Sequence, residues 1–162
     1  MVNIIDLKKQ VLFQDIDERD LHKIAKNLEV LEFKEGEYLY KENEERKGLY
    51  LVHSGKIEVT NSALGGVEYS LFSRGPGDFV GTHVIFGEKK HGTNAKAREN
   101  SVVFLLPKEA FESLENQDVV AAYLIMKNVA HVMSEDQLNL CRKINELTTS
   151  MYHRYIHQLS HE

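Results

Sequence analysis

The chain has 162 residues, a formal net charge of −5 and a hydrophobic content of 42%. This length fits one domain with a full hydrophobic core, with room for one long helix beside it. The acidic balance and the lack of a long basic tract exclude nucleic-acid binding that depends on bulk electrostatics. The N-terminus lacks a signal-peptide pattern, and no apolar run approaches the ~20 residues that span a bilayer, so we predict no membrane partner.

The N-terminal segment, residues 3–28, is predicted to be helical. Asp17 is a good helix N-cap, and acidic Glu18 and Asp20 follow in the first turn, where the helix dipole favours negative charge. Apolar residues then recur at helical spacing on one face: Leu21, Ile24, Ala25 and Leu28. The segment therefore has one apolar face to bury against the rest of the domain.

From Val30 to Leu106 the pattern changes to short strands separated by turns. The stretches that alternate or are wholly apolar are Leu31–Phe33, Tyr38–Tyr40, Leu49–Val52, Ile57–Val59, Val67–Leu71 and Val102–Leu106. Arg74-Gly75-Pro76-Gly77 is a strong turn signal. Many short strands with regularly placed turns predict an antiparallel sandwich or barrel.

After Pro107 the chain is predicted to be helical again. A short helix covers residues 108–114, and Asn116 or Asp118 can cap a second helix. No Gly or Pro follows, so this second helix is expected to be about 40 residues long. Its apolar residues follow helical spacing: Val129, Met133, Leu140, Ile144, Leu147, Met151 and Tyr155.

A small β domain cannot cover so long an apolar stripe. An identical helix is the simplest partner, so we predict a homodimer through this C-terminal helix. The alternative is a helix that breaks near Ser134-Glu135-Asp136 and folds back on its own domain.

The stretch Gly77–Ala97 holds the candidate binding site. A short apolar turn, Val84–Phe86, stands between Gly81 and a polar loop, residues 87–92. Backbone N–H groups in such a turn can form a concave nest for an anion, and only Gly lets the main chain approach closely. On composition alone, however, Gly-rich turns between strands are more often plain turns.

Four segments carry a family resemblance by their order and spacing: Leu12-Phe13, Phe33–Glu37, Leu49–Val59 and Gly77–Gly81. Together they resemble the cyclic nucleotide-binding domain of the catabolite-activator and fumarate–nitrate-regulator (CRP/FNR-like) class, over roughly residues 12–147. The resemblance implies a mainly β fold, an antiparallel jelly-roll barrel with flanking helices. It also implies a regulatory ligand-sensing domain at residues 1–118, followed by the long dimerisation helix at residues 119–162.

The resemblance places the effector site in the phosphate-binding cassette, at Gly81, Thr82, His83, Val84, His91, Gly92 and Thr93. In the family a Glu holds the ribose and an Arg pairs with the cyclic phosphate, whereas this chain has Thr82 and His91 in register. Neutral groups do not easily replace an Arg–phosphate fork. We therefore expect a pocket that binds cyclic AMP or cyclic GMP weakly, or another small effector. A protonated His91 could partly compensate near pH 6.

Two other interpretations remain open for the cassette and the helix. One is a protein-interaction and dimerisation module whose pocket is vestigial. The other is a haem-based sensor that uses His83 or His131, as some members of the wider family do, although a lone His is rarely a ligand. Family transcription factors continue into a helix-turn-helix domain. Here the residues after Leu147 continue as helix, so we expect no specific DNA binding.

No catalytic or metal site is indicated. Ser54 and Ser73 lie in turns without a nucleophile elbow, and no carboxylates are marked out as an acid–base pair. The single cysteine, Cys141, cannot form an internal disulfide, which fits a cytoplasmic protein. We therefore predict a protein that is not an enzyme.

The histidines were considered as metal ligands. His153, His157 and His161 share a helix face but have no acidic or thiolate ligand spaced with them, so we predict no metal. A cupin enzyme is also a small jelly roll, but it needs clustered metal ligands. The barrel histidines are scattered instead: His53, His83 and His91.

Overall fold

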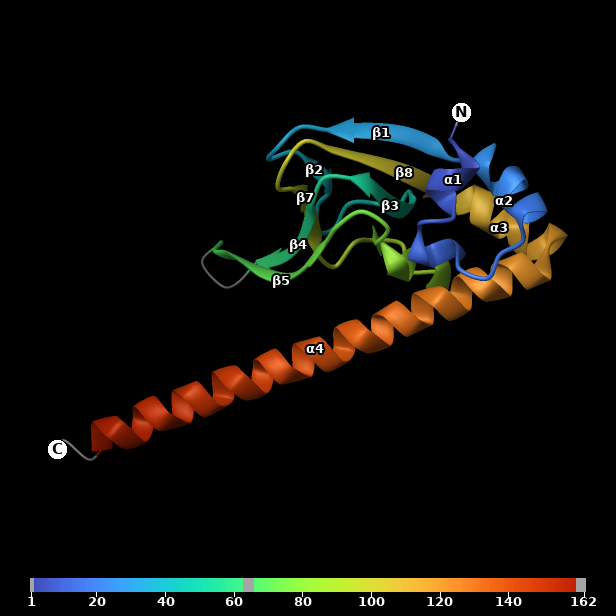
Figure 1. Ribbon diagram of the computed structural model, residues 1–162. Coiled ribbons are helices and arrows are strands. Elements are labelled where there is room, and N and C mark those ends of the chain that lie inside the picture. Colours follow the sequence, from blue (N-terminus) through green and yellow to red (C-terminus); the bar gives the residue numbers. More distant parts are fainter. Residues whose placement is uncertain (1, 63–65, 160–162) are drawn as a thin grey trace. The chain divides into compact units, whose positions relative to one another are not determined.

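The computed structural model describes residues 2–62 and 66–159 (Figure 1). The strands are β1 (Glu29–Phe33), β2 (Tyr38–Tyr40), β3 (Gly48–Ser54), β4 (Ile57–Ser62), β5 (Glu68–Arg74), β6 (Phe79–Val80), β7 (Asn94–Ala97) and β8 (Ser101–Pro107). The helices are α1 (Ile4–Leu7), α2 (Glu18–Ala25), α3 (Lys108–Gln117) and α4 (Val119–Leu159), with 3-10 turns η1 (Val11–Phe13) and η2 (Thr82–Phe86). The chain divides into two compact units between Ala130 and His131, inside α4.

The strands form two four-stranded antiparallel sheets, ordered β1-β8-β3-β6 and β2-β7-β4-β5 (Figure 1). The predicted jelly-roll fold with flanking helices is thus confirmed. Closure into a barrel is not: among the described residues, no strand pairing joins one sheet to the other. Two of the four edge strands in these sheets, β2 and β6, have only three and two residues, and strands so short offer few backbone groups for further pairing.

The core lies between the two sheets, because alternate residues of each strand point inward. Its buried members come from both sheets and include Tyr50, Val52 and Val103 from one and Ile57, Val59 and Ala95 from the other. At Gly48, the start of β3, the backbones of β3 and β8 approach closely. A Cβ at this position would overlap the carbonyl group of Leu106 on β8.

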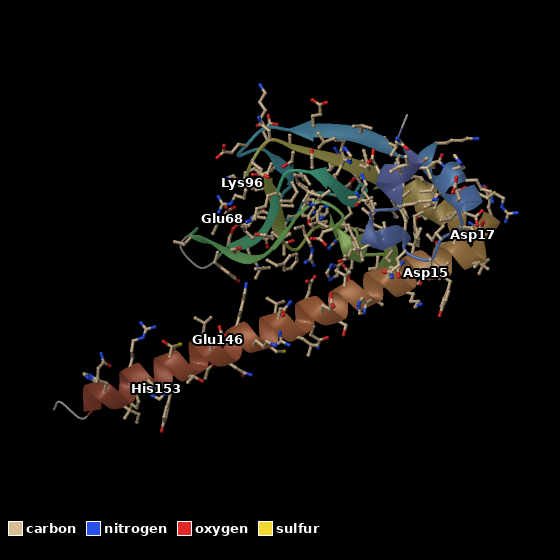
Figure 2. All side chains as sticks on the ribbon, in the orientation of Figure 1. Asp15, Asp17, Glu68, Lys96, Glu146 and His153 are labelled. Carbon is tan, nitrogen blue, oxygen red and sulfur yellow. The ribbon has the colours of Figure 1, made fainter. Side chains whose placement is uncertain are left out.

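The predicted N-terminal helical segment is interrupted. It consists of α1, η1 and α2, and the break before α2 contains Asp15, whose φ of +66° cannot continue a helix. Asp17 takes the N-cap position as predicted, but its side chain makes no capping hydrogen bond. Figure 2 labels both aspartates at this corner. The apolar face of α2 is buried as expected, through Leu21, Ile24 and Ala25.

Helix α4 is continuous from Val119 to Leu159, as predicted, so the alternative of a break near Ser134 is wrong. Asp118 provides the expected cap, since its Oδ1 accepts a hydrogen bond from the Ala121 N–H at 3.2 Å. Asn128, on the buried face of the first turns, donates from Nδ2 to the Leu12 and Gln14 carbonyls, both at 3.0 Å. These bonds anchor the start of α4 to the N-terminal segment.

The compact first unit extends twelve residues into α4, beyond the predicted domain boundary at residues 118/119. The α4 side chains that are buried there are Ala121, Ala122, Ile125, Asn128 and Val129. Within the described ranges 2–62 and 66–159, no helix has the length and apolar character needed to cross a bilayer.

Candidate functional site

The cassette begins where β6 ends. Gly81 follows with φ +87°, η2 comes next, and Gly87 closes η2 with φ +80°. The predicted Gly-framed turn is therefore present, but it starts at Thr82 and is a 3-10 helix. A Cβ at Gly81 would lie 2.9 Å from the Gly48 carbonyl oxygen. Both its positive φ and this close approach require glycine.

Replacing Gly81 by Ala is expected to lower the free energy of unfolding by about 2–3 kcal/mol, because backbone strain and the contact with Gly48 add. Gly87→Ala is a matched control: its φ is similarly positive, but nothing lies within 4 Å of an added Cβ. It should cost only about 1 kcal/mol. Urea denaturation of both variants checks this. Equal losses would show that the close approach at Gly81 contributes nothing.

The loop between β2 and β3, residues 41–47, pairs with the cassette loop. The Asn43 N–H donates to the His91 carbonyl at 2.8 Å, and the His91 N–H donates to the Glu44 carbonyl at 2.9 Å. An antiparallel bridge joins Glu45 to Lys90. These contacts fix the His91 backbone against a segment that is distant in sequence.

His91 lies in the interior of the site. Its side chain is 2% exposed, and its ring stacks on that of Tyr40 with a centroid distance of 3.6 Å and an interplanar angle of 7°. Burial, with a smaller effect of the Arg46 charge, lowers the pKa of His91 to about 4, and Glu44 only partly opposes this. The neutral form of His91 is therefore favoured near pH 6 without a ligand, and compensation by a protonated His91 in a phosphate-bound site stays a prediction.

The Nε2 atom of His91 is buried and has no hydrogen-bond partner among the described residues. Most buried polar side-chain atoms in proteins form a hydrogen bond, and burying a nitrogen without one is destabilising. An unpaired ring nitrogen at this position can form a hydrogen bond with a polar group of a ligand.

Tyr40 joins three of the predicted site residues. Burial raises the pKa of its hydroxyl to about 12, and hydrogen bonds with the Thr93 side chain and the Gly81 backbone partly offset the rise. Its ring faces that of His91. We refer to Tyr40, Gly81, His91 and Thr93 as the Tyr40 cluster. Tyr40 was predicted as a strand residue but not as part of the site.

Arg46 is the second residue that sequence reasoning missed. Its Nε donates to the Lys90 carbonyl at 2.7 Å, and its N–H donates to the Lys89 carbonyl at 3.0 Å. Its positive charge lowers the pKa of both His83 and His91. Arg46 belongs to a run of polar residues, KENEERK, in which nothing local distinguishes it. Only the pairing of the two loops places it beside the cluster.

The other predicted site residues lie elsewhere in the cassette. Thr82 Oγ1 is 3.4 Å from Nδ1 of His83, whose pKa is lowered by desolvation and by Arg46. Val84 is 3% exposed and lines a separate cavity of about 230 Å³ with Leu49, Phe111 and neighbouring residues of α3. Gly92 is exposed. The structure thus brings Gly81, His91 and Thr93 together, whereas Val84 lines a different cavity.

The histidines weighed as haem or metal ligands have ordinary surroundings. The His131 Nε2 lies 3.6 Å from Glu135 Oε1 on α4, and His153, labelled in Figure 2, is exposed. His161 lies outside the described residues. Among residues 2–62 and 66–159, no group of three or more His, Cys, Asp or Glu side chains is placed to hold a metal ion. Haem binding through His83 or His131 stays a prediction.

Comparison with known proteins identifies the family. The protein-family model for the cyclic nucleotide-binding domain matches residues 30–118, more than half of the chain. The chain is 36% identical over 107 residues to the neuropathy target esterase sws of Drosophila willistoni. That alignment covers 60% of this chain but only 7% of the relative. The esterase named there is thus a far longer protein, and this chain spans a small part of it.

Solved structures agree on the fold. The catabolite activator protein of Thermus thermophilus superposes with a TM-score of 0.72 at 22% identity, covering 86% of this chain and 63% of that one. A putative cyclic nucleotide-binding protein of Geobacter metallireducens gives 0.74 at 20% identity, covering 85% and 99%. The match of residues 30–118, together with the two sheets and the Gly-framed cassette, shows that the chain belongs to the cyclic nucleotide-binding domain family and has a CRP-like fold.

Proposed function

We propose that this module senses a small-molecule effector at the Tyr40 cluster, and that it binds cyclic nucleotides weakly. The observation that carries the proposal is the buried, unpartnered Nε2 of His91 beside Tyr40 and Thr93. Weak binding is expected because Thr82 and His91 stand where the family resemblance implies Glu and Arg. His91 is also neutral at physiological pH, so it supplies a hydrogen bond without a charge.

Calorimetric titration with cyclic AMP and cyclic GMP tests the proposal. We expect saturable binding with dissociation constants above about 1 μM for both nucleotides, weaker than roughly −8 kcal/mol of binding free energy. The variant His91→Phe keeps the ring that stacks on Tyr40 but lacks Nε2, so it should bind more weakly than the wild type. A sub-micromolar constant would contradict weak binding. No heat change with either nucleotide at millimolar concentration would contradict an effector site of this class.

The signal is proposed to leave the site through η2. Val84 and Ile85 of η2 line the cavity of about 230 Å³ together with Phe111 and Glu112 of α3. This space allows η2 to shift against α3 when an effector is bound. Because α3 leads into α4 at Asp118, such a shift would favour one position of the first turn of α4 over another. A ligand changes these populations only if it binds the two arrangements with different affinity.

The output is proposed to be self-association through α4, giving a homodimer. On α4 a stripe of apolar side chains continues beyond Ala130. Its exposed members are Ile144, Leu147, Met151 and Tyr155, with Leu147 and Met151 exposed by 63% and 67%. The intervals of three and four residues keep these side chains on one face, and an identical helix offers the same face in a two-fold contact. We assign the module a regulatory rather than a catalytic role.

The second candidate is an interaction module with a vestigial pocket. The stacking of His91 on Tyr40 favours it, because the two rings occupy part of the space that an effector would need. The titration above separates the candidates: an intact dimer that binds neither nucleotide favours the interaction module.

A further inference from the structure

We propose that Arg46 supplies the positive charge that the cassette lacks, and that it pairs with the phosphate of the effector next to the Tyr40 cluster. The inference rests on the proposed effector site and names the chemistry of its ligand, a nucleotide phosphodiester. The charge would then come from the β2–β3 loop and not from the cassette itself.

Arg46 is held in position by its neighbours on the cassette loop. Its backbone N–H and its Nε donate to the carbonyls of two successive residues, Lys89 and Lys90, at 3.0 and 2.7 Å. The next residue in the chain is His91, whose own backbone pairs with Glu44. The backbone bond fixes the main chain of Arg46, and the Nε bond orients its guanidinium before any ligand arrives, which lowers the entropy lost when a ligand binds.

The remaining donors of Arg46 are available. Its Nη1 and Nη2 atoms make no hydrogen bond or ion pair with any residue that the structure describes. Two carboxylates lie near enough to influence this region, those of Glu44 and Glu88. The Glu44 carboxylate accepts a hydrogen bond from the Lys41 N–H at 2.9 Å, and neither forms an ion pair with Arg46. A guanidinium with free terminal nitrogens can bind a phosphate through two parallel hydrogen bonds.

Arg46 and the Tyr40 cluster form one site. Hydrogen bonds to the Lys89 and Lys90 carbonyls join Arg46 to the segment that continues into His91, and its positive charge lowers the pKa of both His83 and His91. This segment also carries the orphaned Nε2 of His91 and the hydroxyl of Thr93, two neutral hydrogen-bonding groups. A phosphodiester has one negative charge and several acceptor oxygens, which fits one arginine surrounded by neutral polar groups.

The test compares Arg46→Gln with Lys47→Gln in the full chain. Both variants remove one positive charge, but Lys47 is exposed and its side chain makes no hydrogen bond to the cassette loop among the described residues. Each protein is titrated calorimetrically with cyclic AMP, cyclic GMP and the phosphate-free adenosine and guanosine. Arg46→Gln should bind the cyclic nucleotides about 10- to 100-fold more weakly than the wild type, with nucleoside binding unchanged. Lys47→Gln should match the wild type.

A second variant and a ligand-free measurement keep the outcomes distinct. Arg46→Lys keeps the charge but loses the fork and the Nε bond, so its affinity should fall between those of the wild type and Arg46→Gln. In NMR titrations without ligand, Arg46→Gln should raise the pKa of His91, which shows that the charge faces the site. Equal cyclic-nucleotide affinity in Arg46→Gln and the wild type would overturn the inference and leave the effector function standing. Failure of the wild type to bind either cyclic nucleotide would overturn both.

Discussion

Acidification from pH 6.5 to pH 4 is expected to reduce the free energy of unfolding by up to about 3 kcal/mol through His91 alone. The folded-state pKa of His91 is about 4, well below its ordinary value of 6.5. Between these values the unfolded chain takes up a proton that the folded chain excludes. Stability is therefore fully present above pH 6.5, falls as the pH decreases, and levels off near pH 4.

Urea denaturation at several pH values between 7 and 4 measures this loss. The variant His91→Phe keeps an aromatic ring on Tyr40 but has no group that titrates, so its profile should lack the histidine component. Carboxylates that titrate near pH 4 contribute to both proteins and cancel in the difference. Parallel profiles for the wild type and His91→Phe would show that His91 is not held neutral by burial.

Introducing acidic residues into the apolar stripe of α4 is expected to convert the proposed dimer into a monomer. In the double variant Leu147→Glu and Met151→Glu, each copy brings two carboxylates into the proposed seam, where charges are costly to bury. Sedimentation velocity or light scattering over a concentration series measures the change. The loss of dimer should be complete at concentrations where the wild type is fully associated.

The matched control is His153→Glu, which introduces a carboxylate on the opposite side of α4. At 3.6 residues per turn, His153 lies about half a turn away from the Leu147–Met151 stripe, as does Glu146, and both are labelled in Figure 2. This variant should remain dimeric, and far-UV circular dichroism should show unchanged helix content in all variants. A wild-type protein that stays monomeric at about 100 μM would remove the proposed homodimer, since a coiled-coil seam of this length associates well below that concentration.

The strand pattern shows how much of the fold local signals contain. Alternating or wholly apolar stretches predicted β2 at its observed bounds and segments that overlap β1, β3, β4, β5 and β8. The two strands that flank the cassette, β6 and β7, were not predicted. β6 has two residues and β7 reads Asn-Ala-Lys-Ala, so neither is long or apolar enough for a pattern. They are strands because β3 and β4 pair with them in antiparallel register.

The sequence by itself determined the fold class, the family, the location of the cassette and the continuity of α4. Those features depend on spacing within the chain: alternation, turn residues, and a helix without Gly or Pro. The tertiary structure alone decided that His91 is buried and neutral, and that the two sheets stay open. It also decided that Arg46 stands beside the Tyr40 cluster, because backbone bonds join Asn43 and Arg46 to residues more than forty positions away. Contacts between loops leave no periodic signal in the sequence, so the charge at the site is visible only in the folded chain.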